Sequence, residues 1–221
     1  MWNHVIEVFR TQIQKASFDA WVKPMKLFAV TSNEVIVTFE DAMSQSVMVN
    51  RYRQRVETLV RTVFGMDYSL KLIDSREAER QQQLVSEAML NPKYTFETFV
   101  TGPSNSFAYA ASLAVAEQPS EVYNPLFLYG DVGLGKTHLM NAIGNFIMAE
   151  RPMSRVLLTT SERFTNELID AIVKKKGTAE LRAKMRNVDV LMVDDIQFLS
   201  KTTATQEEFF HTFNDLYNNG K

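Results

Sequence analysis

The spacing of apolar residues changes twice within the first 73 residues, and each change predicts a different element. Helical spacing comes first, in the set Trp2, Val5, Ile6, Phe9 and Ile13. The elements expected next are a short helix at Phe18 and Trp21 that Pro24 ends, a hairpin of residues 28–30 and 35–39, a helix over 52–63 and a strand over 68–72. This order predicts a small α+β domain over residues 1–73.

Charged residues and glutamine dominate residues 74–90, and Asn91-Pro92 follows. Such a stretch has too few apolar residues to build a core of its own. We interpret it as a linker or mobile helix between two domains.

Apolar runs alternate with helical patterns in residues 91–221, which predicts an α/β fold with a parallel sheet. The expected strands are residues 126–129, 156–159 and 190–193. The expected helices are one with Phe107, Ala110, Ala111, Ala114 and Val115 on one face, then residues 138–148 and 161–172. Thr205 and Glu208 have the spacing of a capping box for a last helix.

Composition excludes several classes of protein. The chain has 221 residues, 45% of them hydrophobic, which is enough for a real core. It has no cysteine, so disulfides and thiolate metal sites are excluded, and its three histidines are scattered. A formal net charge of −2 places any nucleic-acid contact in local patches. The first residues lack a signal-peptide pattern and no long apolar run occurs, so we expect a cytoplasmic protein.

The most specific motif lies between the 126–129 run and the helix over 138–148. Residues 130–137 read Gly-Asp-Val-Gly-Leu-Gly-Lys-Thr. They match the phosphate-binding loop, or P-loop, G-x-x-x-x-G-K-S/T, in the strand, loop and helix context that it requires. A glycine-rich turn that matches by chance is the alternative. The full pattern with its flanks favours a nucleoside triphosphate site.

Each residue type in this loop has a chemical role. Gly130, Gly133 and Gly135 let backbone N–H groups surround the phosphates. Lys136 is expected to reach the β and γ oxygens as a point charge. Thr137 can offer its hydroxyl to Mg²⁺.

A pair of carboxylates follows the buried strand over 190–193. Because the carboxyl ends of parallel strands lie at one edge of a sheet, Asp194 and Asp195 are expected beside the P-loop. We expect Asp194 to hold Mg²⁺ and Asp195 to orient or deprotonate an attacking water. Two solvated aspartates in a turn are the alternative.

Three parallel strands are fewer than a complete P-loop ATPase sheet has, and no apolar run follows the last helix. We therefore expect a sheet that is incomplete at the carboxy terminus, in the amino-terminal part of a longer protein.

Longer stretches of the chain carry a resemblance to one family. They are Tyr94-Thr-Phe-Glu-Thr-Phe-Val100 with Gly102 and Asn105, then residues 124–130, 133–139, 161–164, 193–198 and 205–214. These stretches resemble the first ATPase segments of the DnaA family, the bacterial replication initiators, which are AAA+ ATPases. Trp2, Phe18, Trp21 and Pro24 resemble the same family's amino-terminal KH-like domain.

The resemblance implies three parts. Residues 1–73 correspond to the KH-like assembly and partner-binding domain, 74–90 to a short version of the family's linker, and 91–221 to the first part of the AAA+ domain. The implied fold is therefore an α/β P-loop AAA+ parallel sheet preceded by a small α+β KH-like domain.

The resemblance also implies ligands and roles. ATP or ADP with Mg²⁺ is the expected cofactor set, His138 and Asn105 join the nucleotide-binding residues, and Lys136 and Asp195 are the catalytic ones. Asp131 stands where the family commonly has glycine, which adds a negative charge near the phosphates.

The partners that the resemblance implies are other copies of the protein, through both domains, and the replicative helicase or regulators, through residues 1–73. Origin DNA is a partner of the whole protein. No feature of the sequence indicates acidic phospholipid.

A single strand of DNA is a further expected partner, and it would lie near Lys174-Lys-Lys176, Arg182, Lys184, Arg186 and Lys201. An ordinary solvated face explains these cations equally well. Trp2, in turn, is expected either to cover the core edge or to form a contact with another protein.

Taken together, the sequence predicts an ATP-dependent initiator of bacterial chromosomal replication that assembles on origin DNA and promotes duplex opening and helicase loading. Two alternatives remain, a helicase-loader ATPase and a nucleotide-binding assembly module without turnover. ATP hydrolysis by this chain alone is expected to be weak or absent, because an arginine from a neighbouring subunit normally completes such sites.

Overall fold

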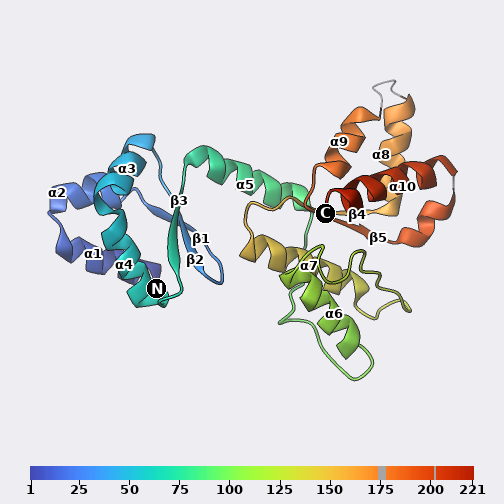
Figure 1. Cartoon of the computed structure of the whole chain (residues 1–221), viewed down its shortest axis with the longest axis horizontal. Helices are drawn as coiled ribbons and strands as arrows, with labels where there is room; N and C mark the ends of the chain where they lie inside the picture. Colours follow the sequence, from blue (N-terminus) through green and yellow to red (C-terminus); the bar gives the residue numbers. More distant parts are fainter. Residues whose placement is uncertain (174–177, 202) are drawn as a thin grey trace. The chain divides into compact units, whose positions relative to one another are not determined.

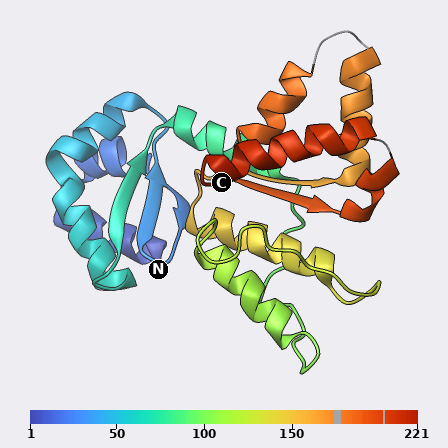
Figure 2. The same ribbon diagram turned by 45° about the vertical axis from the view of Figure 1, so that its right-hand side comes forward.

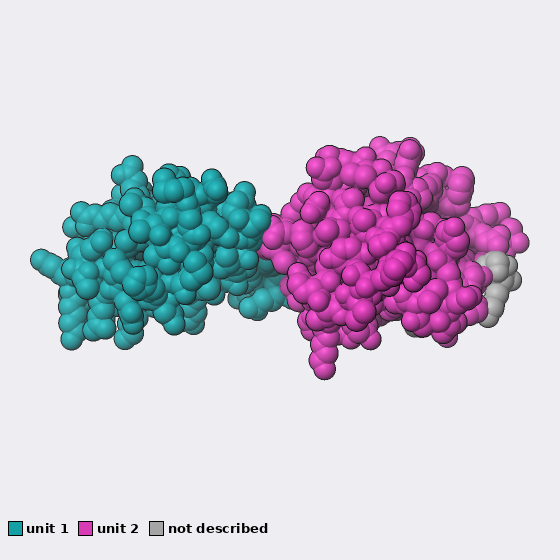
Figure 3. Space-filling model, turned by 90° about the horizontal axis from the view of Figure 1, so that it is seen from below, with its two compact units in different colours: residues 1–83 teal, residues 84–221 magenta. Residues whose placement is uncertain are grey.

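A computed structural model describes residues 1–173, 178–201 and 203–221, with only the backbone described at Ser200 and Lys201. The chain divides into two compact units, Met1–Gln83 (unit 1) and Leu84–Lys221 (unit 2), which Figure 3 colours separately. None of the described helices is long and apolar enough to cross a membrane.

Unit 1 packs helices against a small sheet. Its elements are α1 (Trp2–Gln12), α2 (Lys15–Ser17), a π-helical turn (Phe18–Val22), β1 (Lys26–Val30), β2 (Glu34–Thr38), α3 (Ala42–Val47), a second π-helical turn (Met48–Tyr52), α4 (Arg53–Phe64) and β3 (Ser69–Ile73). The strand order is β1-β2-β3, with β1 antiparallel and β3 parallel to β2. The predicted hairpin is confirmed, whereas α3 was not predicted.

The central strand β2 is buried on both faces. Val35 and Val37 pack into the main apolar cluster with residues of α1 and α4. Figure 1 shows these two helices on one side of the strands. Ile36, between them, points to the other face, because successive side chains of a strand alternate, and it packs there with Ile73 and Ala78. Ala78 belongs to α5 (Ser75–Ala88), so the beginning of this helix packs against the second face of the sheet.

Trp2 belongs to the core of unit 1. Its side chain is only 8% exposed and lies in the same cluster as Val5 and Phe9. Of the two alternatives for Trp2, the structure favours the one in which it covers the core, because the helical spacing of α1 turns it inward with Val5. A contact of Trp2 with another protein stays a prediction. Trp21 is partly buried against the cluster.

Unit 2 places helices on both faces of a short parallel sheet (Figures 1 and 2). Its elements after α5 are α6 (Ser106–Glu117), α7 (Lys136–Glu150), β4 (Val156–Thr160), α8 (Ser161–Val173), α9 (Ala179–Arg186), β5 (Val190–Asp194), a 3-10 turn (Ile196–Lys201) and α10 (Thr203–Asn218). Within the described residues, β4 and β5 pair in parallel, with Val156 opposite Val190. The predicted parallel sheet is confirmed.

Alternating residues of β4 and β5 point to two different clusters. Val156 and Met192 pack with α7 in one, and Leu157 packs with α8, α9 and α10 in the other. Burial on both faces explains why these strands read as continuous apolar runs.

Residues 126–129 do not form the expected strand. Leu126 and Leu128 pack against the α7 cluster while Phe127 and Tyr129 are exposed, so the alternation is that of a strand with one covered face. Among the described residues, however, no neighbouring strand pairs with this segment. A strand needs a hydrogen-bonded neighbour as well as the right pattern.

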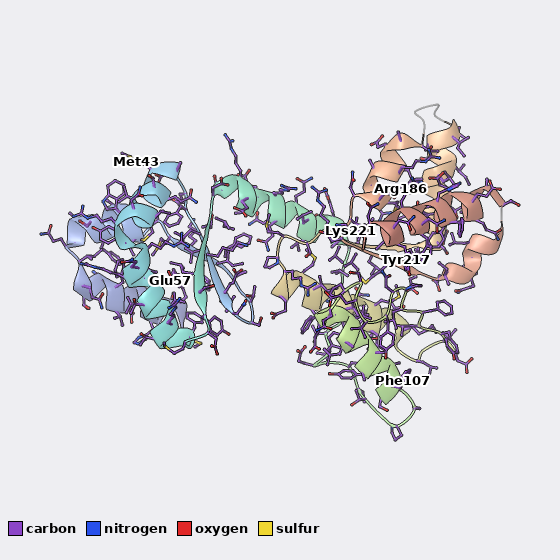
Figure 4. The ribbon with its side chains drawn as sticks, in the orientation of Figure 1. Met43, Glu57, Phe107, Arg186, Tyr217 and Lys221 are labelled. Atoms are coloured by element: carbon purple, nitrogen blue, oxygen red, sulfur yellow. The ribbon has the colours of Figure 1, made fainter. Side chains whose placement is uncertain are left out.

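Two other predictions for unit 2 were wrong. Phe107, expected on one face of α6 together with Ala111, is 80% exposed, whereas Ala111 is buried with Ser112 and Ala116. Figure 4 labels Phe107. The capping box of Thr205 and Glu208 does not form. The helix α10 begins two residues before Thr205, at Thr203.

Candidate nucleotide-binding site

The loop from Gly130 to Gly135 adopts backbone angles that favour glycine. Gly130, Gly133 and Gly135 have φ angles of +145°, +84° and +88°. Residues with a Cβ rarely adopt positive φ angles, whereas glycine does so readily. The three glycines therefore let the loop close on itself in front of α7. Gly135 also faces Phe99 closely, since a Cβ at Gly135 would lie 2.7 Å from Phe99 Cε2.

Lys136 and Thr137 form the first turn of α7, where unpaired N–H groups and the helix dipole favour an anion. Lys136 Nζ donates to the carbonyl oxygens of Gly130 and Asp131, at 2.8 and 2.7 Å. The ammonium group therefore lies within the curve of the loop, where phosphate oxygens would meet it.

The P-loop and the end of β5 meet in one hydrogen bond. Thr137 Oγ1 donates to Asp194 Oδ2 at 2.6 Å. These two residues are 57 positions apart in the chain, and the sequence predicted that the two motifs lie side by side. A hydroxyl and a carboxylate at this distance present the oxygen ligands that Mg²⁺ prefers.

Asp195 adopts a strained backbone conformation directly after β5. Its φ angle is +56°, in the left-handed region that aspartate enters more readily than most residues. Its N–H donates to Asp194 Oδ1 at 2.9 Å, and its carbonyl accepts from Ser161 Oγ at 2.6 Å. Gln197 Nε2 donates to Asp195 Oδ1 at 3.2 Å. Asp194 and Ser161 thus fix the Asp195 backbone, and Gln197 contacts its exposed carboxylate.

Two residues that the sequence did not single out support this geometry. Ser161 is fully buried at the start of α8 and braces the Asp195 carbonyl. Asn141 is buried in α7, where its Nδ2 donates to the Thr137 carbonyl at 2.7 Å. A polar residue on the inner face of a helix is a signal for such a role, because a buried polar group needs a partner.

Asn105 and His138, which the resemblance added to the site, have their side chains engaged with nearby protein groups. Asn105 Oδ1 accepts from the Gly102 N–H at 2.7 Å, and its Nδ2 donates to the Val100 carbonyl at 3.1 Å. His138 Nε2 lies 2.8 Å from the Thr95 carbonyl. Their contact with nucleotide stays a prediction.

The cations around α9 that the structure describes are paired with carboxylates. Arg182 donates from Nε and Nη2 to the two oxygens of Glu208, both at 2.8 Å. Arg186, labelled in Figure 4, contacts Glu208 and Asp215. Lys184 donates to Glu167 at 2.7 Å. These residues therefore tie α8, α9 and α10 together.

The remaining cations of the predicted DNA-binding face cannot be placed in the same way. Lys174-Lys-Lys176 lie outside the described residues, and so does the side chain of Lys201.

The residues of the site fit Mg²⁺ with a nucleotide. In the described part of the chain no group of three or more histidine, cysteine or acidic residues could hold a metal by itself. Mg²⁺ is usually bound by one or two protein oxygens together with phosphates, which is the donor set of Thr137 and Asp194. The glycine loop, the lysine and the strand-end aspartate define a P-loop nucleotide-binding protein.

Comparisons with known proteins agree with this class. Residues 90–221 match the family model described as the bacterial DnaA ATPase domain, and residues 1–62 match the DnaA N-terminal domain. The chromosomal replication initiator protein DnaA of Lachnoclostridium phytofermentans is 42% identical over 237 residues, covering the whole chain and 52% of the relative. The chain belongs to the DnaA family and spans about half the length of this relative.

Solved structures of the family resemble the described fold. Domain III of the Thermotoga maritima replication initiation protein DnaA is 55% identical, with a TM-score of 0.58, and covers 60% of this chain and 55% of that one. DnaA from Aquifex aeolicus bound to AMPPCP is 43% identical, with a TM-score of 0.56 over 60% of this chain and 41% of that one. A DnaA bound to AMPPCP and single-stranded DNA is 42% identical, with a TM-score of 0.57 and the same coverage.

Proposed function

We propose that this chain binds ATP and ADP with Mg²⁺ and is the nucleotide-controlled part of an initiator of bacterial chromosomal replication. The observation that supports the proposal best is the 2.6 Å contact of Thr137 Oγ1 with Asp194 Oδ2. It joins the two halves of a P-loop site from distant parts of the sequence. The AMPPCP-bound relatives support the same ligand class.

Each residue of the site has a role in this proposal. Gly130, Gly133 and Gly135 give the phosphates access to backbone N–H groups. Lys136 neutralises phosphate charge, and Thr137 and Asp194 hold the Mg²⁺, which supplies further charge neutralisation when bound.

Asp195 is the residue that would orient or deprotonate an attacking water. Its exposed carboxylate and its left-handed backbone, braced by Ser161, support this assignment. Weak or absent ATP hydrolysis by this chain alone stays a prediction, because the arginine that completes such sites normally comes from a neighbouring subunit.

For the whole protein, we propose that it assembles on origin DNA, opens the duplex and loads the helicase. In this proposal residues 1–73 are the partner-binding and assembly domain, residues 74–90 are the linker, and residues 91–221 are the first part of the AAA+ domain. The DnaA that is bound to single-stranded DNA supports a single-strand contact. Arg182, Lys184 and Arg186 have carboxylate partners, so we assign that contact to other residues. Membership of the DnaA family supports an initiator over a helicase loader.

The test is nucleotide binding by a Lys136→Ala variant. The charge of Lys136 has no substitute in the loop, so the variant should lose detectable binding of ATP in titration calorimetry, with an unchanged circular dichroism spectrum. Lys184→Ala is the matched control, because Lys184 is an exposed lysine of the same unit that lies on α9, outside the loop. Equal ATP affinity in the wild type and the Lys136→Ala variant would remove the P-loop assignment.

A further inference from the structure

One face of α7 holds a neighbouring segment by polar side chains. His138, Asn141 and Asn145 are spaced three and four residues apart, so they lie on the same side of the helix. Each of them hydrogen-bonds to backbone groups of residues 91–95. We call these three side chains the α7 seam and residues 91–99 the strap.

The two asparagines of the seam hold the beginning of the strap. Asn141 Oδ1 accepts from the Asn91 N–H at 2.7 Å. Asn145 Nδ2 donates to the carbonyls of Asn91 and Tyr94, at 2.8 and 2.9 Å. Asn141 also donates to the Thr137 carbonyl, so the strap and the P-loop threonine share a partner.

His138 holds the middle of the strap in two ways. Its Nε2 lies 2.8 Å from the Thr95 carbonyl, and since a carbonyl only accepts, Nε2 carries the hydrogen. Its ring stacks on Tyr94 with 4.8 Å between centroids and an interplanar angle of 23°. Phe99 meets the same ring edge-on, at 5.1 Å and 75°.

The end of the strap touches the phosphate-binding loop. Phe99 lies against Gly135, where even a methyl group would be 2.7 Å from the Phe99 ring. Gly135 has the left-handed φ of +88° and precedes Lys136. A displacement of Phe99 would therefore free Gly135 to move, and with it the end of the loop.

We propose that His138 is a positioning residue whose hydrogen bond to Thr95 and stacking on Tyr94 keep Phe99 on Gly135, so that the P-loop retains the shape that holds nucleotide. The nucleotide part of this inference rests on the proposed function. In this inference the His138 side chain acts on the P-loop through the strap.

Two variants separate the hydrogen bond from the ring. His138→Phe keeps an aromatic ring for Tyr94 and Phe99 but removes the donor. His138→Gln removes the ring but keeps an N–H donor the same number of bonds from the backbone. His4→Phe is the matched control, because His4 is an exposed histidine of unit 1.

The measurement is the rate at which a fluorescent ADP analogue leaves the full chain. Loss of one hydrogen bond to a carbonyl, about 1.4 kcal/mol, should make release from His138→Phe about tenfold faster. Release from His138→Gln should be about threefold faster than from wild type, because the donor remains but the stacking on Tyr94 is lost. His4→Phe should not differ from wild type.

Hydrogen exchange of the nucleotide-free protein gives a second readout, independent of nucleotide. His138→Phe should raise exchange at the amides of residues 131–137 and leave those of α10 unchanged. A purely structural role of His138 would raise exchange throughout unit 2 in both variants, and that result would overturn the inference. So would wild-type release and wild-type exchange in His138→Phe.

Failure of the proposed function is distinguishable from failure of this inference. If the wild type binds no nucleotide, the proposed function fails, and exchange at residues 131–137 alone decides on His138. If the wild type binds nucleotide and His138→Phe retains it equally well with unchanged exchange, only the inference fails.

Discussion

Unit 1 and unit 2 differ in where they place unusual backbone conformations and exposed aromatic side chains. In unit 1 the described residue with a left-handed φ is Gly65, at the end of α4. In unit 2 such angles occur at the three P-loop glycines and at Asp195, and also at Met89, Ser120 and Gly220. Strained conformations persist where the surrounding structure over-determines them, which is characteristic of functional sites.

Exposed aromatic residues follow the same division. The large apolar cluster of unit 1 includes Trp2 and Phe9. Unit 2 exposes Phe127 and Tyr129 beside the P-loop and Phe210 and Tyr217 on α10, with Tyr217 labelled in Figure 4. Packing therefore accounts for most of unit 1, whereas unit 2 carries features that packing alone does not explain.

Of the variants that test this difference between the units, we expect Trp2→Ala to have the largest effect on stability. Removing a buried aromatic side chain should destabilise unit 1 by about 3–5 kcal/mol. Both tryptophans of the chain lie in unit 1, so the fluorescence of Trp21 reports the urea unfolding of that unit. The urea midpoint should fall sharply in the variant, while the ATP affinity of unit 2 stays unchanged.

Trp2→Phe is the control, since it keeps a ring in the same place and should cost much less stability. If Trp2→Ala leaves the urea midpoint unchanged and weakens concentration-dependent self-association in sedimentation, Trp2 is a contact residue and not part of the core.

Most of unit 1 could be predicted from periodicity because its elements are amphipathic. The spacing that placed Val5 and Phe9 on one side of α1 also determines where Trp2 points. The parallel pairing of β3 with β2 depends on residues far apart in the sequence, and periodicity carries no information about such pairing.

A smaller effect is expected in unit 2 from Glu208→Gln. Glu208 is buried and accepts hydrogen bonds from Arg182 and Arg186, which link α9 to α10. The hydrogen bond from Arg182 lowers the pKa of the Glu208 carboxyl, against the opposing effect of burial. The variant should lose about 1–2 kcal/mol of stability at pH 7.

The pH dependence of this loss follows from the direction of the shift. A lowered pKa in the folded protein means that the ion pairs stabilise it above the ordinary pKa of glutamate, 4.5, and cease to do so as the pH falls through the folded value. Wild type and variant should therefore converge in acid. Urea unfolding followed by circular dichroism at pH 7 and pH 3.5 measures this, with tryptophan fluorescence as the reference for unit 1.

Glu207→Gln is the matched control, because Glu207 is exposed and adjacent. A difference between wild type and Glu208→Gln that is as large at pH 3.5 as at pH 7 would contradict the assignment of the stability to the ion pairs.

The core of the candidate site was predictable because its motifs are local. The spacing of Gly130, Lys136 and Thr137 is contained in eight residues, and Asp194 follows a strand that is itself evident. The supporting contacts were not predictable, because Ser161, Asn141 and His138 act on partners 34, 50 and 43 residues away. The basic residues near α9 suggested a DNA-binding face, because their carboxylate partners lie far from them in the sequence and become evident only in the structure.

The smallest effect is expected from Asp131→Asn, which removes the negative charge that this chain has where the family commonly has glycine. Asp131 is exposed in the loop, and its carbonyl accepts from Lys136 Nζ at 2.7 Å, a contact that the substitution keeps. Two like charges about 8 Å apart in water repel by about 0.5 kcal/mol, so a carboxylate at that distance from a phosphate would weaken ATP binding about twofold and Asp131→Asn should restore it. Salt should reduce the gain, since the screening length falls from about 20 Å at 20 mM salt to about 6 Å at 300 mM. Titration calorimetry at 20 and 300 mM salt measures the affinity for ATP, with Asp67→Asn in unit 1 as the control.

Equal affinities of wild type and Asp131→Asn at low salt would mean that the Asp131 carboxylate points away from the phosphates. The charge of Asp131 in unit 2 would then affect ATP binding as little as the charge of Asp67 in unit 1.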